Sequence, residues 1–141
     1  MKIIVAVDGS PHTQRVLDYL ARHRGSFVDG HSLVLVHVCP GVPGHVARHL
    51  NKGLIADYYA EEADKVLTPV CARLAALQIT GSSIERRHGR AAEEILRSAS
   101  AAGADLIALG TRGHGIFGRA LMGSVAAKVL SAASIPVLLV Q

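Results

Sequence analysis

The densest group of residues suited to chemistry is a glycine-rich stretch near the C-terminus. Five of the chain's 14 glycines fall between Gly110 and Gly123, after an aliphatic run and before a helical pattern that starts near Ser124. Glycine lets a backbone fold back on itself and approach a ligand closely, and the free amides at a helix N-terminus favour an anion. A strand, a glycine-rich loop and a helix in this order predict a phosphate-binding site.

The spacing of these glycines excludes two familiar phosphate motifs. No Gly-Lys-Ser/Thr follows Gly110, so the stretch is not a Walker A loop. The segment from Gly113 to Gly118 fits G-x-G-x-x-G by letter, but it follows a late strand and no acidic residue comes about 20 positions later, as the dinucleotide fingerprint requires. We therefore treat that match as accidental.

A second candidate is Asp8, which directly follows the first aliphatic run in the sequence Asp8-Gly9-Ser10. Ligands of open α/β sheets bind beyond the carboxyl ends of the strands, where the strand order reverses. Asp8 and the glycine-rich stretch meet there if their two strands are neighbours, which predicts the strand order 3-2-1-4-5. A carboxylate in this place can accept hydrogen bonds from ribose hydroxyls or hold a metal. Together the two features predict a nucleotide site.

Continuous aliphatic runs predict the parallel sheet that would position these residues. Strands are expected at residues 3–7, 33–38, 105–109 and 136–140, with a more polar edge strand at 83–88. Helices are expected at 10–24, where Ser10 and Pro11 suit a helix start, and at 54–77, 91–102 and 124–133. Pro69 is expected to kink or break the second helix, and residues 39–53 to form a long loop. The alternation defines one α/β domain, residues 1–141, with an open five-stranded parallel sheet and helices on both faces, a Rossmann-like arrangement.

The composition excludes several function classes. The 141 residues carry a formal charge of +4 and are 50% hydrophobic but only 4% aromatic, so the chain folds yet offers few rings for base stacking, and no nucleic-acid partner is expected. Cys39 and Cys71 lack the spacing of a zinc site or a disulfide framework. No apolar run approaches a membrane span or a signal peptide, so we expect no membrane partner and a cytoplasmic location.

His45 and His49 stand four residues apart, a spacing that could hold a metal on a helix. Pro and Gly around them and the lack of a third ligand favour a solvated loop over a metal site.

The positive charge is concentrated around the glycine-rich stretch. Between Arg86 and Arg119 six arginines stand against three acidic residues. We attribute this excess to a nucleotide's phosphates at Arg112, and at Arg119 if it also faces them, and to surface solubility elsewhere.

Several motifs resemble those of the universal stress protein family, in particular its ATP-binding branch. They are residues 3–10, the pair His37-Val38, the closing residues 129–130 and 135–140, and the pattern G-x2-G-x9-G-Ser at Gly110, Gly113, Gly123 and Ser124. The resemblance covers essentially the whole chain. It implies the adenine nucleotide alpha hydrolase-like fold and a homodimer formed through the last strand, Pro136 to Val140.

The resemblance also implies a set of site residues. Asp8 would contact the ribose, the backbone of Ala6 and Val7 would flank the adenine, and the main chain of Val38 would bind the adenine edge. The remaining nucleotide-binding residues would be Ser10, Gly110, Arg112, Gly113, Gly115, Gly123, Ser124 and Val125, most of them around the phosphates. The ligand would be ATP, or ADP or AMP, with Mg²⁺ or Mn²⁺ held by the phosphates and not by protein side chains alone.

The function implied is that of a nucleotide-dependent regulatory protein of the stress response, acting as a dimer. A fast enzyme is not expected, because no carboxylate or Gln is evidently placed to orient water beside Arg112, His114 and Arg119. A slow ATPase or self-phosphorylating enzyme of the same fold is the alternative. An adenylating enzyme would need a phosphate loop after the first strand, a phospho-receiver a second acidic residue beside Asp8, and a flavin carrier an aromatic sandwich.

Overall fold

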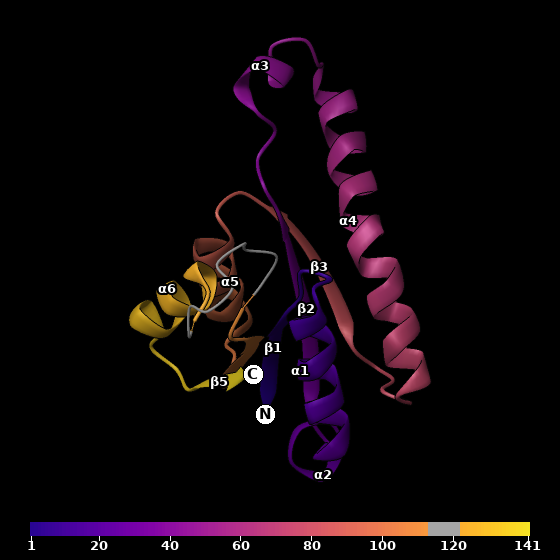
Figure 1. Cartoon of the computed structure of the whole chain (residues 1–141), viewed down its shortest axis with the longest axis vertical. Coiled ribbons are helices and arrows are strands. Elements are labelled where there is room, and N and C mark those ends of the chain that lie inside the picture. The colour runs from indigo at the N-terminus through magenta and orange to yellow at the C-terminus, as the bar shows by residue number, and fades with distance from the viewer. Residues whose placement is uncertain (113–121) are drawn as a thin grey trace.

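A computed structural model describes residues 1–112 and 122–141, which build one parallel sheet covered by helices (Figure 1). The strands are β1 (Lys2–Ala6), β2 (Ser32–Cys39), β3 (Ser83–His88), β4 (Leu106–Gly110) and β5 (Val137–Val140). They pair in the order β3-β2-β1-β4-β5, and every pair is parallel. The predicted fold class and strand order are confirmed.

Two layers of helices enclose the sheet. The helices are α1 (Pro11–Arg22), α2 (Arg24–Phe27), α3 (Gly44–Ala47), α4 (Lys52–Ala76), α5 (Ala91–Ala102) and α6 (Ser124–Ala132). The chain packs α1 and α4 on one face and α5 and α6 on the other (Figure 1). Within the described part of the chain, no helix combines the length and the apolar character needed to cross a membrane.

The central strand β1 is aliphatic at successive positions because both of its faces are buried. In β1, Ile3 and Val5 pack toward α1 and α4, whereas Ile4 packs toward α5 and α6, and all three are 0% exposed. A strand covered on both faces needs apolar residues at every position, not at alternate ones. β1 therefore presents Val7 and Asp8 at a fixed point, the carboxyl edge of the sheet.

The two edge strands differ in polarity. β3 carries the polar sequence expected of an edge and pairs with β2 alone among the described strands. β5 was expected to be buried like the central strands, but only Val140 is buried, and Val137, Leu138 and Leu139 are half-buried. The reason is its place in the sheet, since β4 covers only one side of it.

Two expectations for the segment after β2 differ from the structure. Pro69 was expected to kink or break its helix, and the break is wrong, because α4 runs unbroken over 25 residues. Pro69 and Lys65, whose carbonyl loses its helical partner, both lie on the exposed side of the helix, where water can bind that carbonyl. The loop expected at 39–53 contains the short helix α3 and the start of α4, whose first turn is capped by the Asn51 side chain accepting a hydrogen bond from Leu54 N at 2.8 Å.

Candidate functional site

A cavity of about 490 Å³ opens where the carboxyl ends of β1, β2 and β4 meet the N-terminal ends of α1, α5 and α6. Its size lies in the range of small-molecule sites, roughly 300–1,000 Å³. It also lies at the point where the strand order reverses, because β1 has β2 on one side and β4 on the other. The described residues that line it are Ala6, Val7, Asp8, Thr13, Val36, Val38, Ala91, Ile95, Leu109, Gly110, Thr111, Arg112, Met122, Gly123, Ser124, Val125 and Ala126.

The cavity brings together nine of the twelve residues predicted for the nucleotide site. These are Ala6, Val7, Asp8, Val38, Gly110, Arg112, Gly123, Ser124 and Val125. Ser10 is buried and does not line the cavity. Gly113 and Gly115 lie outside the described residues, as do His114 and Arg119. Residues from three separate parts of the sequence therefore converge on one space.

Asp8 is held in a tight turn between β1 and α1. Gly9 adopts φ +76°, a left-handed conformation that favours glycine, and the Ser10 amide donates to Asp8 Oδ1 at 2.9 Å. The Thr13 hydroxyl donates to the same oxygen at 2.8 Å and accepts from Asp8 N at 3.0 Å. Three hydrogen bonds therefore fix both the backbone and the carboxylate of Asp8.

His37 supports the same turn from the neighbouring strand. The residue is 6% exposed, and its Nδ1 lies 2.9 Å from the carbonyl oxygen of Val7. Nδ1 acts as the donor there, because a carbonyl only accepts. The His37-Val38 pair thus has two roles, since His37 secures the end of β1 while Val38 lines the cavity on the opposite face of β2.

The N-terminus of α6 supplies backbone donors on the far wall. Ser124 is the first residue of α6, where the helix was predicted to start, and Gly123 is the N-cap. The Gly123 amide donates to the Thr111 carbonyl and ties the start of α6 to the end of β4. The first amides of a helix have no acceptor within it, and they favour an anion. The exposed Arg112 adds a positive charge to this wall.

Two buried polar atoms at the start of α1 have no hydrogen-bond partner among the described residues. They are Ser10 Oγ and His12 Nδ1. Ser10 occupies the predicted N-cap position before Pro11, but its side chain makes no capping hydrogen bond. The predicted helix start is therefore confirmed without the capping interaction expected of it.

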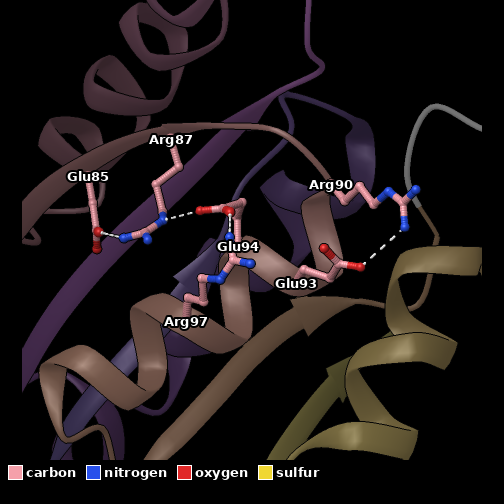
Figure 2. Close-up of polar contacts among 6 residues, drawn as sticks. All are labelled: Glu85, Arg87, Arg90, Glu93, Glu94 and Arg97. Atoms are coloured by element: carbon pink, nitrogen blue, oxygen red, sulfur yellow. Dashed lines mark hydrogen bonds and ion pairs between the residues drawn. The ribbon is translucent and has the colours of Figure 1, made fainter.

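An ion-pair network joins β3 to α5, as Figure 2 shows. The Arg87 guanidinium donates to Glu94 Oε2 at 2.8 Å and also to Glu85, while Arg97 donates to the other Glu94 oxygen. The buried Ser98 hydroxyl donates to Glu85 as well. Ala91 and Ile95 of α5 line the cavity, so this network ties one cavity wall to β3.

The arginines of this region are therefore engaged with carboxylates. Arg86 pairs with Asp64 at 3.1 Å and Arg90 with Glu93 at 3.4 Å, in addition to the pairs of Arg87 and Arg97. Arg86 and Arg90 are exposed, as expected of residues that serve solubility, whereas Arg87 is only 24% exposed and links β3 to α5. Arg112 is left as the arginine that lines the cavity within the described ranges.

Glu94 is predicted to make the stability of the fold sensitive to acid. The hydrogen bond from Arg87, opposed by burial and assisted by the charge of Arg97, lowers the pKa of its carboxyl below the ordinary value. A depressed native pKa contributes stability above the unfolded-state value, about 4.3, and that stability is lost as the pH falls through the native pKa. We expect Glu94→Gln to unfold at a lower urea concentration than the wild type at pH 7 and to lose less stability on acidification.

Glu93→Gln is the matched control, since Glu93 lies on the same helix turn with a more exposed side chain and a longer ion pair. Urea unfolding at pH 7, 5, 4 and 3 tests the prediction. Parallel curves for Glu94→Gln and the wild type across this range would show that Glu94 does not carry the acid sensitivity.

Several lining residues were missed by the sequence analysis. Thr13 lies in the first turn of α1, and its contact with Asp8 becomes visible only when the turn before the helix is known. The apolar wall comes from Val36, Ala91, Ile95 and Met122. The strand order itself could have indicated part of this wall, because a helix after β3 must cross the sheet to reach β4 and passes over β2 and β1.

Fold and site together define an open parallel α/β domain with a small-molecule cavity at its switch point. Residues 1–141 match the universal stress protein family. A universal stress protein of Thermus aquaticus, encoded in the QAH/OAS sulfhydrylase 3′ region, is 34% identical over 142 residues, 99% of this chain and 97% of the relative. The chain belongs to the universal stress protein family.

Solved structures share the fold along the full chain. The universal stress protein UspA from Lactobacillus plantarum aligns with a TM-score of 0.81 at 19% identity, covering 100% of this chain and 97% of that one. A universal stress protein from Archaeoglobus fulgidus, solved in complex with dAMP, aligns with a TM-score of 0.62 at 26% identity, covering 100% and 98%. The second is a relative whose bound ligand is an adenine nucleotide.

Proposed function

We propose that this protein binds an adenine nucleotide, ATP in particular, in the cavity at the end of β1, and acts as a nucleotide-dependent protein of the stress response. The observation that carries the proposal is the convergence of Asp8, Val38 and the start of α6 on one cavity. The dAMP bound to the Archaeoglobus fulgidus relative supports the class of ligand. Two free cysteines, Cys39 and Cys71, fit the cytoplasm as its location.

The chemistry of the walls fits the parts of a nucleotide. Val36, Val38, Ala91 and Ile95 offer an apolar slot for a base, next to the Asp8 carboxylate, which can accept hydrogen bonds from sugar hydroxyls. The α6 amides and Arg112 lie on the wall that suits phosphates. Asp8 is the one acidic residue among the described lining residues, so a divalent cation would be held chiefly by the phosphates.

Calorimetric titration with ATP, AMP and CTP in the presence of Mg²⁺ tests the proposal. We expect saturable binding of one adenine nucleotide per chain and weaker binding of CTP, whose smaller base leaves part of the apolar slot unfilled. Analysis of the nucleotide that co-purifies with the protein provides an independent readout. No heat with either adenine nucleotide, together with no co-purified nucleotide, would refute the function.

We also propose that two copies pair through the outer edge of β5. Ile107 N donates to the Pro136 carbonyl and Thr111 N to the Val140 carbonyl, so alternate residues of β5 face β4, while Val137 and Leu139 direct their backbone groups outward. This edge is apolar and half-buried, and no other described strand pairs with it. Such an edge is a template for pairing with another strand, and a two-fold axis makes it complementary to itself.

Sedimentation equilibrium of the wild type, Leu139→Pro and Leu139→Ala tests this pairing. We expect the mass of two chains for the wild type and for Leu139→Ala, which keeps the outward N–H. Leu139→Pro lacks this N–H and should sediment as a single chain. A wild type with the mass of one chain contradicts the proposal.

A further inference from the structure

Thr13 links α1 to the carboxylate at the centre of the cavity. It is the third residue of α1, is 3% exposed, and lines the cavity itself. Its hydroxyl donates to Asp8 Oδ1 and accepts from Asp8 N, so one oxygen atom contacts both the side chain and the backbone of Asp8. This ring of two hydrogen bonds attaches Asp8 to α1, and a helix holds its residues more rigidly than a loop does.

The ring determines which carboxylate orientation the cavity presents. Ser10 N and Thr13 Oγ1 both donate to the same carboxylate oxygen, Asp8 Oδ1, at 2.9 and 2.8 Å. Without the Thr13 hydroxyl the Asp8 carboxylate would lose one of the donors that orient it, and the Asp8 amide would lose its acceptor. A group that is already oriented binds its ligand more tightly, because less conformational freedom is lost on binding.

We propose that Thr13 is a positioning residue that orients Asp8 toward the sugar and thereby sets a preference for nucleotides that carry sugar hydroxyls. This inference rests on the proposed function. It predicts that Thr13 matters only for ligands with a hydroxyl to offer Asp8, so that ATP is affected and 2′,3′-dideoxy-ATP is not. The Archaeoglobus fulgidus relative fits the same chemistry, since dAMP retains its 3′-hydroxyl.

The experiment measures the dissociation constants of ATP and 2′,3′-dideoxy-ATP for the wild type, Thr13→Val and Thr13→Ser. We expect the wild type to prefer ATP. Thr13→Val should weaken ATP binding about tenfold, the loss of roughly one hydrogen bond to a charged group, and leave the dideoxy analogue unchanged. Thr13→Ser retains the hydroxyl and should retain the preference.

Two controls separate positioning from stability. Thr68→Val makes the same exchange at an exposed position of α4 and should change neither constant. If Thr13→Val does not fold, Thr13→Ala removes the hydroxyl without adding bulk and gives the same comparison. Equal weakening of both ligands, or unchanged ATP binding, would overturn the role of Thr13. A wild type that binds neither ligand would instead refute the proposed function.

Discussion

Replacing Val38 with tryptophan is expected to abolish nucleotide binding and to leave the fold intact. Val36 and Val38 both line the cavity and pack with the α5 and α6 layer, whereas Leu35 packs on the opposite face of the sheet. A larger side chain at Val38 therefore enters the cavity rather than the core beneath α4. The indole occupies the space assigned to the base, and the affinity for ATP should fall at least about 30-fold, or about 2 kcal/mol.

Leu54→Trp is the control for adding an indole elsewhere. Leu54 lies on α4, is 49% exposed and is not among the residues that line the cavity. Titration with ATP and thermal unfolding should show loss of binding in Val38→Trp alone, with similar midpoints for both variants. Binding of ATP by Val38→Trp as tight as by the wild type would place the base somewhere else.

Replacing Gly110 with alanine is expected to lower the free energy of unfolding by about 1–3 kcal/mol, the usual cost of overpacking. A Cβ atom at Gly110 would come within 2.6 Å of His12 Cβ, and 3.4 Å from the His12 carbonyl carbon. Relief therefore requires α1 to move away from β4. Because the start of α1 holds Thr13 and β4 leads to Arg112, the same movement should weaken ATP binding.

Gly41→Ala is the matched control, since a Cβ there meets nothing within 4 Å. His12→Ala should not rescue Gly110→Ala, because it keeps the Cβ that clashes, whereas His12→Gly should relieve part of the strain. Urea unfolding of these variants measures the effect. Equal stability of Gly110→Ala and Gly41→Ala would show that the contact between α1 and β4 tolerates a methyl group.

This contact gives a structural reason for the first glycine in the G-x2-G-x9-G-Ser pattern, Gly110. The pattern suggested a glycine needed for close approach to phosphate. In the structure Gly110 lines the cavity, but the atoms nearest to its missing side chain belong to His12 and Arg112. A glycine at this position is therefore required by the packing of α1 on β4, whatever the ligand.

The sheet could be predicted because its signal is local. An aliphatic run such as Ile3 to Val7 predicts a strand that is buried on both faces. The pairing of β1 with β4 was predicted because Asp8 and the glycine-rich stretch could form one site only if their strands were neighbours. The half-exposure of β5 could not be predicted in this way. An apolar run indicates that a strand needs to be buried, but it does not indicate whether other parts of the same chain cover the strand.

The site residues that belong to a sequence motif could be predicted, whereas those that reach the cavity only through the packing of the fold could not. Asp8 and Gly123 stand in recognisable sequence contexts. Thr13 and Ile95 reach the cavity because α1 and α5 pack on opposite faces of the sheet and both begin at its carboxyl edge. The unbroken helix at Pro69 could not be predicted, because the cost of a proline depends on whether water can reach the carbonyl four residues earlier.

Mapping the binding of ATP by NMR on ¹⁵N-labelled protein tests directly whether the cavity is the nucleotide site. If the cavity is the nucleotide site, the amide signals that shift on titration should cluster at residues 6–8, 36–38, 109–112 and 122–126. Those of α3 and of the N-terminal end of β4 should stay in place. Shifts that cluster away from the residues that line the cavity, or no shift at saturating ATP, would show that ATP does not bind there.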